Sequence, residues 1–177
     1  MTKDQNFLKW HYPDDVIKKA KQIELLAFDV DGVLTDGGLY YDHEGNDLKK
    51  FFAQDGHGIK IVQSRGIEIM IISGRQAACV DHRAQELGIK YVVQGSRDKL
   101  KSFHEQNTSS SLEKVCFVGD DTVDVGILNS VGLSVLVPNS HPTIDIKQFD
   151  WVTKRNGGYG AIRDVCDLIY FSKTLNE

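Results

Sequence analysis

Two aspartates, Asp29 and Asp31, are separated by one residue directly after the apolar run of residues 25–28. In an open α/β sheet, ligands bind beyond the carboxyl ends of the strands, so a carboxylate pair at the end of a buried strand lies where a site is expected. Two like charges this close repel each other unless a proton or a cation lies between them, and Mg²⁺ prefers oxygen ligands. The pair therefore predicts a magnesium site.

Three later segments place complementary groups at equivalent positions. Residues 73–75, Ser-Gly-Arg, follow the apolar run 67–72, Lys99 opens a predicted helix after residues 90–93, and Asp120, Asp121 and Asp124 follow residues 115–118. Because the carboxyl ends of parallel strands meet at one edge of a sheet, we expect these side chains to lie close to Asp29. A carboxylate nucleophile, an acid/base neighbour, a hydroxyl, a lysine and acids for magnesium together suit phosphoryl transfer.

Each of these segments also has an ordinary structural interpretation. Ser73 could cap a helix, Lys99 could be a surface lysine, and the acids after Gly119 could favour a helix N-terminus. Their joint order at four strand ends favours the functional interpretation.

Apolar runs alternate with amphipathic segments along the chain. The predicted strands are residues 23–29, 67–72, 90–93, 115–118, 133–137 and a short one near 151. The predicted helices are residues 14–21, 59–64 after a loop around Gly56 and Gly58, 76–87, 98–106, 122–130, 142–147 and 159–171. This alternation predicts an α/β, doubly wound, mostly parallel sheet of the Rossmann-like type. Residues 39–41 and 48–52 flank a turn and predict a β-hairpin flap over the acidic pair.

Composition limits the class of protein. A chain of 177 residues with 41% hydrophobic residues suits one domain, residues 1–177, with a helical lead-in over 1–22 and a C-terminal helix and tail over 154–177. A net charge of −4 without a basic run argues against nucleic-acid binding. The three cysteines lack metal-ligand spacing, so we expect free thiols in a reducing compartment. The N-terminus lacks the apolar core of a signal peptide and no segment reaches membrane-spanning length, so we expect a cytoplasmic protein without a membrane partner.

The four segments, in this order, resemble the signature motifs of the haloacid dehalogenase superfamily of phosphohydrolases. The resemblance implies that Asp29 attacks phosphorus and forms an aspartyl-phosphate, while Asp31 protonates the leaving oxygen and later activates water. It also implies that Ser73 bonds the transferring phosphoryl group and that Lys99 offsets charge on the phosphorylated intermediate.

The same resemblance implies how Mg²⁺ is bound. The ligands would be the Asp29 carboxylate, the Asp31 backbone carbonyl and Asp120. Asp121 or Asp124 would support these ligands through water or through Lys99.

The spacing of the motifs leaves no room for a cap domain. A hairpin and one helix account for the residues between Asp31 and Ser73, and one helix and one strand for those between Ser73 and Lys99. At finer grain the chain resembles the capless 3-deoxy-D-manno-octulosonate 8-phosphate phosphatases, which act in lipopolysaccharide biosynthesis. The resemblance covers residues 23–38, 40–41, 55–60, 71–75, 98–100, 119–121, 155–163 and 165–169. It implies a phosphorylated sugar acid as substrate and a homotetramer with sites at subunit interfaces.

We expect Arg75 to recognise the substrate, because a guanidinium suits a sugar-acid carboxylate. Arg75 is also next to Gly74 and Ser73, which are expected to bind the phosphate. Further substrate contacts are predicted for Gly32, Asp55, His57, Lys60 and Arg155. The glycine-rich stretch after Arg155 would either reach an adjacent active site or cap the last helix as an ordinary loop.

Two other functions remain open at this point. A phosphatase for nine-carbon, sialic-acid-like sugar phosphates would share the capless scaffold and the chemistry. A non-catalytic phosphatase-like interaction module would share the scaffold alone, and the presence of Asp29, Asp31, Ser73, Lys99 and Asp120 argues against it. A phosphorylated signalling receiver is disfavoured because its acidic pair is normally adjacent and its phosphoacceptor lies on a later strand.

Overall fold

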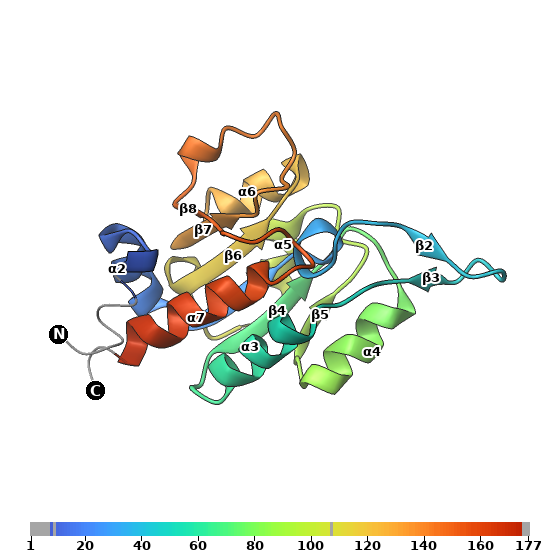
Figure 1. Ribbon diagram of the computed structural model, residues 1–177, viewed down its shortest axis with the longest axis horizontal. Helices are drawn as coiled ribbons and strands as arrows, with labels where there is room; N and C mark the ends of the chain where they lie inside the picture. The colour runs from blue at the N-terminus through green and yellow to red at the C-terminus, as the bar shows by residue number, and fades with distance from the viewer. Residues whose placement is uncertain (1–7, 9, 107, 175–177) are drawn as a thin grey trace.

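Six parallel strands form the central sheet of the protein. A computed structural model describes residue 8 and residues 10–106 and 108–174. The strands follow the order β5-β4-β1-β6-β7-β8, and every neighbouring pair is parallel (Figure 1). They are β1 (Leu25–Phe28), β4 (Glu68–Ile72), β5 (Tyr91–Val93), β6 (Val115–Gly119), β7 (Leu133–Leu136) and β8 (Trp151–Val152). The predicted α/β, Rossmann-like sheet is confirmed.

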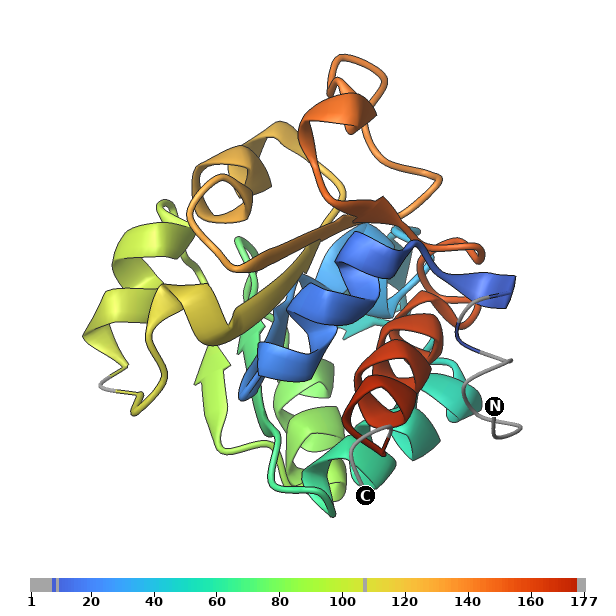
Figure 2. The same cartoon turned by 90° about the vertical axis from the view of Figure 1, so that its left-hand side faces the viewer.

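Helices cover both faces of this sheet. They are α2 (Asp14–Gln22), α3 (Ala53–Gln63), α4 (Ala78–Leu87), α5 (Lys99–Glu105), α6 (Val125–Leu128) and α7 (Ala161–Thr174). Alternate residues of β1 point to opposite faces, so Leu26 and Phe28 pack with α2, α3, α4 and α7, whereas Leu25 and Ala27 pack with α5 and α6. Figure 2 shows helices on both sides of the sheet. Burial on both faces explains why the strands read as continuous apolar runs.

Helix α3 begins six residues earlier than predicted. Residues 53–58 are helical, although Gly56 and Gly58 favoured a loop in the sequence. A Cβ at Gly56 would lie 2.3 Å from the Arg83 side chain, and one at Gly58 would lie 2.8 Å from the Arg163 side chain. The glycines therefore allow close packing of α3 against α4 and α7, and this tertiary gain outweighs their low helix propensity.

A β-hairpin projects from the body of the protein (Figure 1). Strands β2 (Tyr40–Tyr41) and β3 (Asp47–Leu48) pair antiparallel, as predicted, although each is only two residues long. Between the loop after β1 and strand β4, a stretch that the structure describes throughout, the helices and strands of the chain are only this hairpin and α3. The edge of the sheet above β1 therefore has no cap domain from this stretch.

Three predicted helices differ from the structure. Residues 122–130 form a 3₁₀ turn (Thr122–Asp124) followed by the short α6, and residues 142–147 form turns that end in a 3₁₀ turn (Ile146–Gln148). The Asp145 carboxylate accepts a hydrogen bond from the Lys147 N–H, an arrangement that favours a local turn over a helix. Helix α7 begins two residues later than predicted because Gly160 has a φ of +110°. In the described part of the chain, no helix combines the length and apolarity that crossing a membrane requires.

Candidate active site

The structure brings the four sequence segments together at the carboxyl edge of the sheet. A cavity of about 180 Å³ lies there, between the ends of β1, β4 and β6 and the start of α5. Its lining includes Asp29, Asp31, Ser73, Gly74, Arg75, Lys99, Asp120 and Asp121. Parallel strands place their carboxyl ends side by side, and this topology alone accounts for the convergence.

Asp29 is buried and held at both carboxylate oxygens. Its Oδ1 accepts a hydrogen bond from the Val30 N–H at 2.7 Å, and its Oδ2 lies 2.9 Å from Lys99 Nζ. Burial raises the pKa of Asp29 to about 6, although Lys99 favours the ionised form. Fixed donors on both oxygens orient the carboxylate toward the cavity, which suits a nucleophile.

Asp124 organises the loop after β6. Its Oδ1 lies 2.5 Å from Lys99 Nζ, and its Oδ2 accepts hydrogen bonds from the backbone N–H groups of Asp120 and Asp121. Both Asp124 and Lys99 are buried, so this ion pair fixes Lys99 between two carboxylates. Asp121 is exposed, and its carboxylate accepts a hydrogen bond from the Thr122 N–H at the rim of the cavity. Asp124 thus fixes Lys99 through an ion pair and fixes the backbone of Asp120 through a hydrogen bond.

The arrangement of acids fits a divalent cation. Carboxylate oxygens of Asp29, Asp120 and Asp124 lie within 4.8 Å of one another. Asp120 Oδ1 is buried and has no hydrogen-bond partner, and burial together with the charges of Asp29 and Asp124 raises the pKa of Asp120 to about 8. A bound cation would satisfy this oxygen and remove the repulsion. Asp29 and Asp120 line the cavity, whereas Asp124 is fully buried and does not line it, so Asp29 and Asp120 are the better direct ligands.

Gly32 allows Asp120 to reach the loop after β1. A Cβ at Gly32 would lie 2.0 Å from Asp120 Oδ2, and its φ of +88° favours glycine. Gly32 is buried against Asp120 and is not among the residues that line the cavity, so the structure gives it a steric role and does not bring it to the predicted substrate contact.

Ser73 offers a hydroxyl donor to the cavity. The residue is buried, and its Oγ accepts a hydrogen bond from the Arg75 N–H at 3.2 Å, so its own hydrogen can bond an anion. The backbone of Gly74 lines the same wall. This geometry suits the predicted contact with a phosphoryl group.

Arg75 links the cavity to the hairpin. Its Nη2 donates hydrogen bonds to Asp47 Oδ2 at 3.0 Å and to the Tyr41 hydroxyl at 3.4 Å, while 42% of its side chain is exposed. A half-exposed guanidinium at the rim can exchange these partners for a substrate carboxylate.

The sequence prediction missed Lys49 and Asp47. Lys49 Nζ lies 2.5 Å from Asp31 Oδ1, and Asp47 bonds Arg75. The sequence did carry a signal: the predicted hairpin stands over the acidic pair, and alternation along it sends Lys49 and Lys50 to opposite sides. One of these two lysines was therefore a candidate for the site.

Two residues that were predicted to contact the substrate, Asp55 and Arg155, lie instead where α3 packs against the start of α7. Asp55 is fully buried, its Oδ1 accepts a hydrogen bond from the Arg163 N–H at 2.7 Å, and burial raises its pKa to about 6. Arg155 pairs with Asp164 at 2.7 Å and donates to Gln54. Neither residue lines the cavity of its own chain, because each is used to attach the start of α7.

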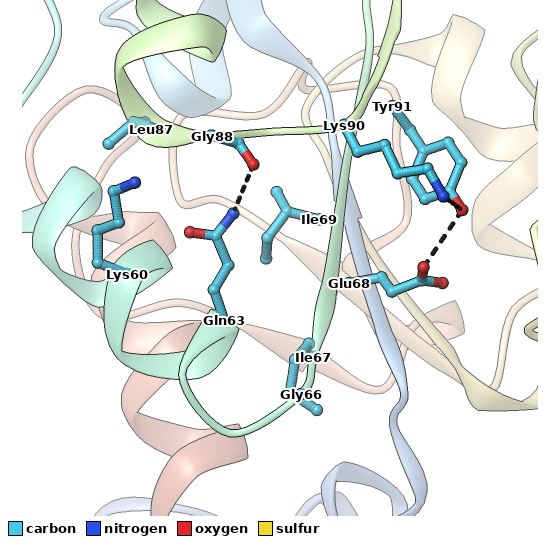
Figure 3. A pocket seen from close by; sticks show the side chains of 10 residues that line it. All are labelled: Lys60, Gln63, Gly66, Ile67, Glu68, Ile69, Leu87, Gly88, Lys90 and Tyr91. Atoms are coloured by element: carbon cyan, nitrogen blue, oxygen red, sulfur yellow. Dashed lines mark hydrogen bonds between the residues drawn. The ribbon is translucent and has the colours of Figure 1, made fainter.

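His57 and Lys60 lie on the outer side of α3. Both line a hollow of about 310 Å³ with Arg83. Lys60 also borders a hollow of about 410 Å³ at the amino end of β4, the end opposite Ser73, where Gln63 bonds the Gly88 carbonyl and Tyr91 bonds Glu68 (Figure 3). The structure therefore does not bring His57 or Lys60 to the cavity of their own chain.

The glycine-rich stretch after Arg155 packs against the loop after β1 of its own chain. The Gly158 N–H donates to the Val33 carbonyl at 3.1 Å. Asn139 connects the two segments, because its Nδ2 donates to the Gly32 carbonyl and its Oδ1 accepts from the Gly157 N–H. These contacts attach the stretch to the loop that carries Gly32 and Val33, and its reach into an adjacent active site, which concerns a second chain, stays a prediction.

Comparisons with known proteins agree on one family. The 3-deoxy-D-manno-octulosonate 8-phosphate phosphatase of Yersinia pestis is 42% identical over 166 residues, which cover 93% of this chain and 88% of the relative. The solved structure of a phosphatase of that name from the same organism superposes with a TM-score of 0.88 at 42% identity and covers 91% of this chain and 88% of the other.

Two further solved structures extend the comparison. A hydrolase of the haloacid dehalogenase superfamily from Legionella pneumophila is 40% identical, with a TM-score of 0.87 and coverage of 91% and 89%. A 3-deoxy-D-manno-octulosonate 8-phosphate phosphatase from Moraxella catarrhalis, in complex with magnesium, phosphate and 3-deoxy-D-manno-octulosonate (KDO), is 38% identical, with a TM-score of 0.87 and coverage of 92% and 94%.

No family model matches the chain. The sequence identity to the Yersinia pestis phosphatase extends over most of both chains and is sufficient on its own to assign the family. The geometry of the site agrees with this assignment. The chain therefore belongs to the 3-deoxy-D-manno-octulosonate 8-phosphate phosphatase family of the haloacid dehalogenase superfamily.

Proposed function

We propose that this protein is a magnesium-dependent phosphatase that hydrolyses KDO 8-phosphate to KDO and phosphate through an aspartyl-phosphate on Asp29. The observation that carries the proposal is the buried Asp29 carboxylate, held by the Val30 N–H and Lys99 at a cavity that Asp31, Ser73 and Asp120 also line. Relatives named 3-deoxy-D-manno-octulosonate 8-phosphate phosphatase align with most of the chain, which supports KDO 8-phosphate as the substrate.

The residues divide the reaction into two steps. Asp29 Oδ attacks phosphorus, the bond from phosphorus to the sugar oxygen breaks, and Asp31 donates a proton to that oxygen. Asp31 then accepts a proton from the water that attacks the aspartyl-phosphate, and Asp29 is released. Ser73 donates a hydrogen bond to the phosphoryl group, and the ammonium of Lys99 offsets its charge. Bound by Asp29, the Asp31 backbone carbonyl and Asp120, Mg²⁺ would neutralise charge on the phosphoryl oxygens.

Arg75 is our candidate for recognition of the sugar-acid carboxylate. It lies at the rim of the cavity, and its partners Asp47 and Tyr41 come from the hairpin. Gly74 brings the adjacent backbone to the cavity wall. A phosphatase for nine-carbon sugar acids would need the same guanidinium, but the names of the relatives favour the eight-carbon substrate.

We also propose a homotetramer with active sites at subunit interfaces. The hairpin carries four exposed large hydrophobic residues, namely Leu39, Tyr40, Tyr41 and Leu48. Contiguous exposed apolar residues on a projecting element favour a protein contact. A neighbouring subunit would also give roles to the outward-facing His57 and Lys60, which lie outside the cavity of their own chain.

A cytoplasmic location agrees with the state of the cysteines. Cys116 and Cys166 are buried, Cys79 is partly buried, and all three are free thiols. Free thiols persist in reducing compartments, which favours the cytoplasm.

The test is a phosphate-release screen with Mg²⁺ over phosphorylated sugar acids of eight and nine carbons. We expect the highest kcat/KM with KDO 8-phosphate and no turnover after chelation of the metal. Preference for a nine-carbon acid would overturn the substrate assignment. Absence of release from every compound would favour the non-catalytic interaction module.

A further inference from the structure

One buried cation, Lys49, has no part in the two steps of the proposed reaction. Lys49 follows β3 on the return side of the hairpin, and only 1% of its side chain is exposed. Its Nζ lies 2.5 Å from Asp31 Oδ1 and 3.7 Å from Asp47 Oδ2. Burying an ammonium group costs desolvation free energy, so we expect Lys49 to have a role beside Asp31 in addition to attaching the hairpin.

The two oxygens of Asp31 have different surroundings. Oδ1 accepts the hydrogen bond from Lys49. Oδ2 is buried and has no hydrogen-bond partner, and Arg75 Nε lies 3.7 Å from it. Because Asp31 lines the cavity, Oδ2 is the oxygen that remains free to exchange a proton with a bound substrate.

We propose that Lys49 is a positioning residue that fixes Asp31 through Oδ1, so that Oδ2 faces the oxygen of the leaving group. The inference rests on the proposed function, because it assigns Lys49 a part in the same reaction. Asp31 Oδ2 gives its proton to the sugar oxygen as the bond from that oxygen to phosphorus breaks and the bond from Asp29 to phosphorus forms. Oδ2 regains a proton from the attacking water. Lys49 keeps its own proton throughout.

The neighbouring Lys50 attaches the hairpin to the body of the protein but has no role at the cavity. Its Nζ lies 3.0 Å from Asp36 Oδ2 and over the ring of Tyr159, while 48% of its side chain is exposed. This pair connects the hairpin to the body without contact with the cavity lining. Lys50→Met is therefore a matched control for Lys49→Met, because the two variants remove one ammonium each from adjacent residues.

The experiment compares two substrates that differ in their need for a proton. A sugar alkoxide needs protonation as it leaves, whereas p-nitrophenolate leaves without it, and kcat/KM reports the step in which the leaving group departs. Lys49→Met should lower kcat/KM for KDO 8-phosphate by roughly 10-fold to 100-fold, a part of the contribution of general acid catalysis, and lower it for p-nitrophenyl phosphate by less than about 3-fold. Lys49→Arg, which keeps a cationic donor, should restore most of the loss.

The control and the stability measurement separate the alternatives. Lys50→Met should leave both kcat/KM values unchanged. Lys49→Met should melt within a few degrees of Lys50→Met, because Arg75 still lies 3.7 Å from Asp31 Oδ2 and 3.0 Å from Asp47 Oδ2 and offsets both charges. An equal loss on both substrates, or no loss on either, would overturn the positioning role. A wild-type enzyme inactive on every sugar phosphate would contradict the proposed function instead, so the two failures can be told apart.

Discussion

Asp29 and Asp31 are the same residue type, and their neighbours give them different chemistry. Asp29 is buried with a fixed donor on each oxygen, whereas Asp31 has one oxygen fixed by Lys49 and one without a hydrogen-bond partner among the described residues. Fixed donors on both oxygens suit a carboxylate that attacks, and a free oxygen suits one that exchanges protons. The division of labour between the two residues follows from these contacts.

Lys99 is the cation on which this arrangement most depends. It lies between Asp29 and Asp124, both buried. Lys99→Met should lower the free energy of unfolding of the metal-free protein by about 3 kcal/mol or more, because breaking a buried ion pair leaves an uncompensated charge. Denaturant titration measures this loss. The control is Lys101→Met, since Lys101 is exposed and its ion pair with Glu105 is 3.9 Å long. Equal stability of the two variants would contradict the role of Lys99.

Asp55 gives the fold a dependence on pH. Burial raises its pKa from 3.8 to about 6. A raised folded-state pKa stabilises the fold below the unfolded pKa, and this contribution is lost as pH rises through the folded pKa. Asp55→Asn keeps an acceptor for the Arg163 N–H without the charge, so its advantage over the wild type should grow from about pH 4 to about pH 6 and then level off, at about 3 kcal/mol. Melting temperatures across this range test the prediction. An advantage that stays constant with pH, or no greater than that of the exposed Asp15→Asn, would contradict it.

At the scale of the elements, the loop after β1 depends on packing by segments that are distant in the sequence. A Cβ at Gly157 would lie 1.7 Å from the Gly32 carbonyl oxygen, so Gly157→Ala must displace the backbone beside Asp31. We expect a loss of about 1–3 kcal/mol in the free energy of unfolding, typical of overpacking, and a fall in kcat. Gly126→Ala is the control, because a Cβ there meets nothing within 4 Å and α6 should gain up to about 1 kcal/mol. Gly157→Ala with wild-type stability and kcat would show that the contact is dispensable.

The sequence predicted the elements whose evidence is local. Every strand of the sheet was found from an apolar run, because strands buried on both faces are continuously apolar. The start of α3 was missed because the reason for Gly56 and Gly58 lies on α4 and α7. Residues 142–147 were wrongly predicted as helical because their composition outweighed the turn chemistry of Asp145.

The same difference between local and tertiary evidence explains which residues of the site were predicted and which were missed. Asp29, Ser73 and Asp120 each directly follow a strand, and Lys99 begins the helix after β5, so topology brings them together at the cavity. Lys49 was missed because alternation along the hairpin leaves open whether Lys49 or Lys50 faces Asp31. Arg155 was placed at the site because its ion pair with Asp164 is set by tertiary packing.

At the scale of the whole molecule, the proposed tetramer places a second subunit against the hairpin, which carries exposed apolar residues. Leu39 and Leu48 are 52% and 49% exposed. Replacing both with Ser should convert the proposed tetramer into smaller species and lower activity, because the apolar contact is lost. Sedimentation velocity measures the assembly, and Ile146→Ser, which removes a comparably exposed residue elsewhere, should not change it. An unchanged assembly in the hairpin variant would contradict the role of these residues.

The most direct test of the central claim is phosphate release from KDO 8-phosphate by the wild type and by Asp29→Asn, measured together with Mg²⁺. This substitution keeps the shape of the side chain and removes the nucleophilic carboxylate. The account predicts rapid release by the wild type and a loss of roughly 10⁴-fold or more in kcat for the variant, as expected for removal of a nucleophile. Equal rates in the two proteins would contradict the assignment of Asp29 as the residue that attacks phosphorus.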